Sequence, residues 1–215
     1  MKKIRDDIGK TIDSEDNLPK MILIEQAIDS AYEIEEPVSR SYAFCDCIIA
    51  ILEFARETSN EETLEGIIPL LDQINNKGAY ARAKCYLAVV LASFNKTDEA
   101  EDALLDAINY ATEIRDDFDR RDAFLDIATS LGDISFMQNK RKLLDMSLHF
   151  SDQLTQGQKA YLLGYLSTII SDEDGIALMR DAIEIANKIK DPITRSKVFL
   201  ELSSLLTNFN KLAKS

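Results

Sequence analysis

The sequence of 215 residues has no tryptophan, one histidine, four prolines and seven glycines. So few Gly and Pro residues exclude a fold built from many tight turns and long loops, because these residues dominate turns. There are three cysteines, an odd number with no regular spacing. A disulfide framework is therefore not predicted, and the thiols indicate a reducing, cytoplasmic compartment.

Positive charge and long hydrophobic runs are also scarce. Lys and Arg number 25 against 38 acidic residues, so the formal net charge is −13. This balance argues against nucleic acid and anionic membranes as main partners, and it favours a basic partner. The longest apolar stretches, such as residues 86–94, are too short to span a bilayer, and the charged N-terminus "MKKIRDDIGK" does not resemble a signal peptide. We expect no membrane segment.

Helix-forming residues dominate the composition, and one pattern recurs. The spacing Ala-Ile-x-x-Ala-x-x-Ile occurs at residues 27–34, 107–114 and 182–189, with a blurred copy at 147–154 and a degraded one ending at Ile74. Its apolar positions fall on one face of a helix. The pattern therefore predicts an amphipathic helix that is repeated along the chain.

Each copy precedes a short break and a second predicted helix. The breaks in "EIEEPVSRSYAF" (residues 33–44) and "KIKDPITRSKVF" (residues 188–199) show the match most clearly. Pro37 and Pro192 suit the first position of a helix, and Asp191 is a plausible N-cap. The break recurs every 35 to 42 residues, as marked by Arg40, Arg82, Arg120, Ala160 and Arg195.

A two-helix unit of this length is typical of an α-solenoid. We predict an all-α fold, an α-α superhelix of about five helical hairpins with ten or eleven antiparallel helices. It would form one domain over residues 1–215, with turns near 37, 78, 117, 157 and 192 and irregular or frayed ends at 1–15 and 208–215. Pro69 does not fit the pattern; it should bend the helix that ends near Ile74 or mark a late start of that helix.

The segment "AEDALLDA" at residues 100–107 resembles the second-helix signature of the tetratricopeptide-like superfamily of helical-hairpin repeats. The resemblance extends over about residues 18–207, although the units are longer than the usual ~34 residues and lack the first-helix Trp, Leu-Gly and Tyr positions. It implies a right-handed superhelix whose concave groove binds proteins or peptides.

Candidates for catalysis or metal binding are few. His149 aligns with polar residues of the other repeats, which predicts a solvent-facing position. Cys45, Cys47 and Cys85 align with core positions, so they read as small buried residues. The segment 171–175, "SDEDG", lacks the remaining ligands of a calcium loop. We predict no catalytic centre, no metal and no cofactor.

The recurring arginines allow two interpretations. Arg40, Arg82, Arg120 and Arg195 each fall in the first turn of a predicted helix, where a cation opposes the helix dipole. Each could form a structural ion pair or reach back to the carbonyls of the preceding helix. Alternatively, they form a row of cations that binds an acidic peptide or phosphate.

One helix face changes character between repeats. It is polar in the third and fifth units but apolar in the fourth, at Leu162, Leu166 and Ile169, and intermediate in the second, at Lys84 and Leu91. Either another element covers this face, or it binds a partner.

Taken together, these patterns predict a non-catalytic scaffold or adaptor that binds a peptide or helix of an unknown protein. The alternatives are a helical enzyme or small-ligand sensor with a pocket between helices, and a self-assembling structural element. The last predicted helix carries Val198, Phe199, Leu202 and Leu206, which also suggests a homodimer through this helix.

Overall fold

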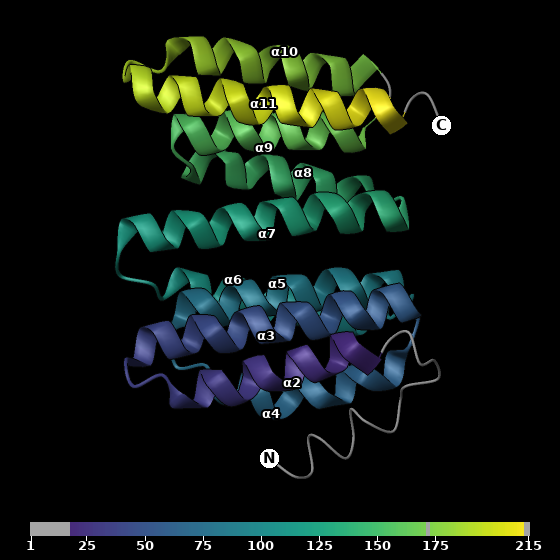
Figure 1. Cartoon of the computed structure of the whole chain (residues 1–215). Helices are drawn as coiled ribbons and strands as arrows, with labels where there is room; N and C mark the ends of the chain where they lie inside the picture. Colours follow the sequence, from purple (N-terminus) through teal and green to yellow (C-terminus); the bar gives the residue numbers. More distant parts are fainter. Residues whose placement is uncertain (1–17, 171–172, 213–215) are drawn as a thin grey trace. The chain divides into compact units, whose positions relative to one another are not determined.

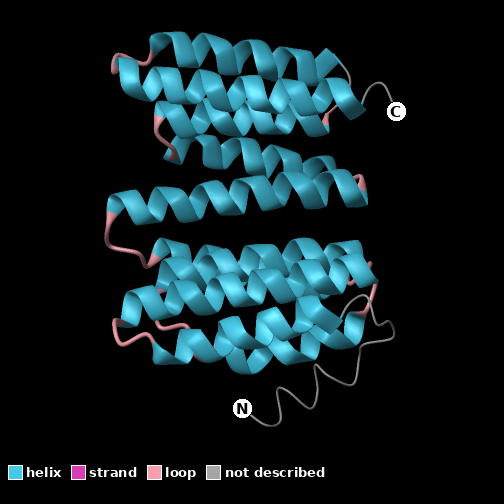
Figure 2. Cartoon of the chain, in the orientation of Figure 1, coloured by secondary structure: helices cyan, strands magenta, loops and turns pink. Residues whose placement is uncertain are grey.

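The computed structural model describes residues 18–170 and 173–212. Within them the chain forms ten α-helices and two 3₁₀ helices, and no strand (Figures 1 and 2). The all-α prediction is confirmed. The last helix continues to Leu212, into the end at 208–215 that was predicted to be irregular or frayed, and residues 1–15 lie outside the described part.

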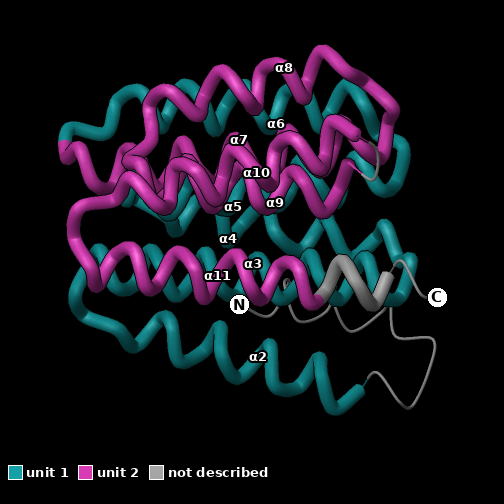
Figure 3. Tube along the Cα trace, turned by 90° about the horizontal axis from the view of Figure 1, so that it is seen from above, with its two compact units in different colours: residues 1–115 teal, residues 116–215 magenta. Residues whose placement is uncertain are grey.

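The helices group into two compact units, residues 1–115 and 116–215 (Figure 3). Unit 1 contains α2 (Leu18–Glu33), α3 (Pro37–Thr58), η1 (Glu61–Ile67), α4 (Ile68–Leu71), α5 (Lys77–Ser93) and α6 (Thr97–Thr112). Unit 2 contains α7 (Asp117–Gln138), α8 (Arg141–Phe150), η2 (Ser151–Gln153), α9 (Gln156–Ile169), α10 (Glu173–Lys188) and α11 (Pro192–Leu212). That residues 1–215 form one continuous domain stays a prediction.

The sequence breaks coincide with helix starts, because they hold residues that cap helices. α3, α5, α7, α9 and α11 begin at or next to the five predicted turns. The Glu36 carboxylate accepts hydrogen bonds from the N–H groups of Val38 and Ser39 at 2.9 and 2.6 Å. The Asp191 carboxylate accepts one from the Thr194 N–H at 2.8 Å, as expected of an N-cap.

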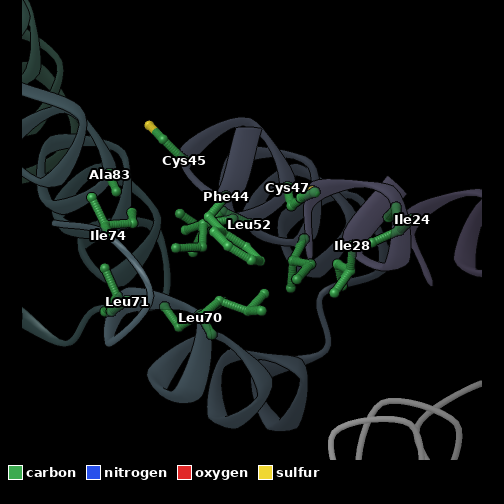
Figure 4. Close-up of a cluster of buried hydrophobic side chains, with 14 of the residues drawn as sticks. Ile24, Ile28, Phe44, Cys45, Cys47, Leu52, Leu70, Leu71, Ile74 and Ala83 are labelled. Carbon is green, nitrogen blue, oxygen red and sulfur yellow. The ribbon is translucent and has the colours of Figure 1, made fainter. Parts of the chain in front are cut away.

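In unit 1, α3 packs against α2, η1, α4 and α5, and α5 packs against α6. Figure 4 shows Phe44 and Leu52 of α3 between Ile24 and Ile28 of α2 and Leu70 of α4. All five side chains are buried. The core of this unit therefore forms around one central helix.

In unit 2, α9 has the central place and packs against α7, α10 and α11. Two glycines allow close approach. A Cβ at Gly132 of α7 would lie 2.4 Å from the Leu166 Cδ2 atom, and one at Gly164 of α9 would lie 2.3 Å from the Leu202 Cδ2 atom. The absent side chains provide the space that these leucines fill.

Candidate functional site

A groove of about 710 Å³ lies in unit 1, between the η1–α4 segment and the helices α5 and α6. Its walls combine leucine and isoleucine side chains with carboxylates. The lining residues are Glu61, Glu62, Leu64, Glu65, Ile67, Ile68, Leu71 and Asp72 on one side and Tyr80, Lys84, Leu87, Leu91, Lys96 and Glu99 on the other.

One wall of the groove is formed by a 3₁₀ helix and a single α-helical turn rather than by a long α-helix. Seven residues of η1 form a 3₁₀ helix, longer than such helices usually run. The Asn60 side chain caps it by accepting the Glu62 N–H at 3.0 Å. α4 then begins at Ile68 with Pro69 in its first turn, as the late-start interpretation of Pro69 predicted, but it ends at Leu71 rather than near Ile74. Ile68 stays 62% exposed at the groove.

Lys84 is held along the opposite wall. Its Nζ atom donates to the Asp106 carboxylate at 2.8 Å and lies 5.5 Å from the centre of the Tyr80 ring. Burial alone would lower the pKa of Lys84, but the hydrogen bond to Asp106 and the influence of Tyr80 and Asp106 outweigh it, so the pKa is raised. Lys84 therefore stays protonated, and the Asp106 carboxylate neutralises its charge.

Lys96 connects the two walls. Its ammonium pairs with Glu61 of η1 and, at 3.4 Å, with Glu99 of α6. The hydrogen bond to Glu61 is the main cause that raises the pKa of Lys96. This ion-paired lysine links η1 to the start of α6 at the groove.

The remaining carboxylates of the groove are not neutralised in this way. Glu62, Glu65 and Asp72 are exposed, and none of them forms an ion pair within residues 18–170 and 173–212. The groove thus has an apolar lining with an acidic rim.

Two of the predicted partner-binding residues, Lys84 and Leu91, lie in this groove. Only the edge of Leu91 is accessible, because its side chain is 6% exposed. The rim carboxylates, Ile68 and Tyr80 were missed by the sequence analysis. Pro69 was the signal that pointed to this segment, since it departs from the repeat.

The interpretation of Leu162, Leu166 and Ile169 as an open partner surface is wrong. Leu162 and Leu166 are fully buried, and they pack in a cluster with Ala128 of α7 and Leu144 of α8. Ile169 is half-buried against the same cluster. Of the two alternatives, the structure shows that helices of the same unit cover this face, because α9 is enclosed between α7 and the pair α10–α11.

The recurring arginines have partners within the chain. The Nη1 atoms of Arg40 and Arg195 point at carbonyl oxygens six residues earlier, those of Ile34 at 3.5 Å and Ile189 at 3.3 Å. The other two pair with carboxylates: Arg82 with Asp46 at 4.0 Å, and Arg120 with Asp117. These contacts favour the structural interpretation over a row of binding cations.

The residues considered for catalysis or metal binding do not line the groove. Cys45, Cys47 and Cys85 are buried, and burial, with a smaller effect of the Asp46 charge, raises the pKa of the Cys47 thiol to about 11. His149 is exposed on α8. Among the described residues no cluster of three His, Cys, Asp or Glu side chains could hold a metal; Ser171 and Asp172 of the "SDEDG" segment lie outside them.

In the parts of the chain that the structure covers, no helix has both the length and the hydropathy needed to cross a bilayer. Compared with models of protein families, with curated proteins and with solved structures, the chain gave no match. The tetratricopeptide-like family therefore stays a resemblance, carried by the residues quoted above.

Proposed function

We propose that this chain is a non-catalytic interaction module of the tetratricopeptide-like kind, whose hairpins stack as a solenoid and whose groove in unit 1 binds a segment of a partner protein. The regular helix starts at α3, α5, α7, α9 and α11 support the repeat. The cysteines, all buried, fit a cytoplasmic location.

The groove carries this proposal. It is open, it exposes apolar side chains such as Ile68, and it has polar groups at its edge, as sites for peptide segments do. Exposed apolar surface of this kind marks interaction sites.

The enzyme alternative is less well supported. Catalytic groups usually have a pKa shifted toward neutrality by burial and by neighbours. The two lysines in the groove have raised pKa values and are held in ion pairs with carboxylates, so neither is a base at neutral pH. We place binding ahead of catalysis for this reason.

The test compares proteins captured from a lysate of the native host by wild type, Ile68→Glu and a control, Leu105→Glu. Both substituted residues belong to unit 1 and are exposed, 62% and 56%, but only Ile68 lines the groove. Circular dichroism first establishes that all three are folded. We expect a protein that wild type and Leu105→Glu retain and Ile68→Glu loses. Identical capture by all three would show that the groove is not the site.

Homodimerisation through the last helix stays a separate prediction. Ile193 and Leu200 of α11 are 69% and 70% exposed, which supports an interface there. Sedimentation of a monomer at micromolar concentration would exclude it.

A further inference from the structure

We propose that the segment bound in the groove of unit 1 is a basic amphipathic peptide of a partner protein, with Lys or Arg residues flanking apolar side chains. This inference rests on the proposed function and adds to it the chemical class of the partner. It depends on the distribution of charge, the placement of the apolar side chains and the geometry of the η1 wall.

The charge of the groove is negative at its accessible edge. Five carboxylates and two ammonium groups line it. Both ammonium groups are occupied: Lys84 by Asp106, which is outside the lining, and Lys96 by Glu61 and Glu99. An acidic ligand would have to compete with these carboxylates for the ammonium groups, whereas a basic one would leave the ion pairs intact.

The other three of the five lining carboxylates, Glu62, Glu65 and Asp72, have no cationic partner in the described structure. All three come from one wall, so their charges add on that side of the groove. Complementary charge across an interface accelerates association and excludes partners of the wrong sign. The wall therefore selects Lys- or Arg-rich segments over acidic peptides and phosphates.

The geometry of η1 places charge beside apolar surface. In a 3₁₀ helix, side chains three residues apart eclipse one another. Glu62 and Glu65 therefore share one edge of η1, and Ile68 follows at the same spacing as the first residue of α4. Thr63 and Gly66, on another edge, are buried. The accessible edge thus offers two carboxylates followed by one apolar side chain.

The facing wall carries apolar side chains on either side of Lys84. Leu87 and Tyr80 of α5 are half-buried, and both line the groove. A ligand with apolar side chains between cationic ones would contact this surface and the acidic edge together. An entirely hydrophilic basic peptide would satisfy only half of the site.

The experiment titrates the chain of 215 residues against three fluorescent synthetic peptides of equal length, followed by anisotropy at physiological ionic strength. The first is an amphipathic Leu/Lys peptide, the second replaces each Lys with Glu, and the third replaces each Leu with Ser. We expect binding of the Leu/Lys peptide and at least about tenfold weaker binding of the other two, since each lacks one complementary feature.

The decisive variants are Glu62→Lys/Glu65→Lys and a matched control, Glu35→Lys/Asp181→Lys. Both pairs change the net charge equally, and all four residues are exposed, but only the first pair lines the groove. We expect the groove pair to weaken binding of the Leu/Lys peptide by about tenfold or more and the control pair by much less. Equal weakening would mean that the peptide responds to the net charge of −13, and it would overturn the proposal.

The remaining outcomes separate this inference from the proposed function. If Ile68→Glu abolishes capture of a native partner while Glu62→Lys/Glu65→Lys leaves capture and peptide binding unchanged, the groove is a binding site but its partner is not basic. If neither variant affects either readout, both proposals fall.

A peptide of residues 1–17, which contains Lys2, Lys3, Ile4 and Ile8, serves as a competitor. If it binds the groove more tightly than the Leu/Lys peptide, the chain's own N-terminus is the occupant and the partner proposal is wrong.

Discussion

Single residues determine how closely the helices of unit 2 approach. At Gly132, a methyl group would meet the end of the Leu166 side chain at 2.4 Å. Leu166 is fully buried, so its removal leaves a cavity rather than an accessible surface. The side chain of Leu166 therefore occupies the volume that a side chain at position 132 would need.

We predict that Gly132 and Leu166 are energetically coupled. Leu166→Ala alone should cost about 2–5 kcal/mol of unfolding free energy by forming a cavity. Gly132→Ala alone should cost about 1–3 kcal/mol through overpacking, partly offset by the better helix propensity of alanine. In the double variant the new methyl group occupies vacated space, so the total cost should fall below the sum by about 0.5–3 kcal/mol. Urea unfolding of the four proteins measures this, and simple additivity would contradict it.

Cys47 gives a prediction about alkaline pH. Its folded pKa of about 11 lies above the ordinary 9.0, so the unfolded thiol loses its proton first. The stability linked to this group is therefore fully present below about pH 9 and is lost as the pH rises toward 11. Melting temperatures of wild type and Cys47→Ala, measured between these pH values, should fall less steeply for the variant. Parallel curves would contradict the assignment.

The stability of a helix depends on how its ends are capped. The Gln158 N–H donates to the Thr155 hydroxyl at 3.3 Å, and the Thr155 N–H donates to the Gln158 side chain at 3.1 Å. Gln158 also donates to Asp122 of α7 at 2.6 Å. The start of α9 is thus capped and connected to its neighbour by the same side chain.

We predict that Thr155→Ala lowers the unfolding free energy by about 0.5–2 kcal/mol, because it removes the N-cap acceptor. Thr207→Ala is the control, since Thr207 is exposed within α11 and its hydroxyl only donates to the Ser203 carbonyl within the same helix. Thermal and urea unfolding compare the two. Equal effects on stability would show that the capping box contributes nothing specific.

The elements could be predicted from sequence to the extent that local signals fix them. Pro37, Pro192 and Asp191 mark helix starts because their backbone preferences and capping groups act over a few residues. The burial of Leu162 could not be predicted, because periodicity identifies an apolar face but not the helix that covers it. The groove was missed because it depends on seven residues adopting 3₁₀ geometry, for which the sequence offered only Pro69 as a signal.

At the scale of the whole molecule, the chain divides into units with cores of their own. The core of unit 1 extends from Met21 to Val90. The clusters of unit 2 include Ala128 and Leu166 in one and Leu163 and Leu202 in another. Each unit therefore buries the apolar faces of its own helices, as an independently folding domain does.

We predict that residues 1–115 and 116–215, expressed as separate chains, each fold. The second begins at Asp116, which caps α7 by accepting the Phe118 N–H at 2.9 Å. Helical circular dichroism and a cooperative urea transition should be present in both fragments. Fragments without cooperative unfolding would contradict this prediction, because each unit would then depend on the other for its stability.

The 3₁₀ conformation of η1 also affects the length of the wall. At about 2.0 Å per residue, seven residues advance about 14 Å, against about 10 Å in an α-helix. η1 is therefore longer and narrower than an α-helix of seven residues would be. A single inserted residue would rotate everything after it by about a third of a turn and move Ile68 away from the edge that carries Glu62 and Glu65. Homologues that use this groove should therefore vary in the composition of η1 but keep its length.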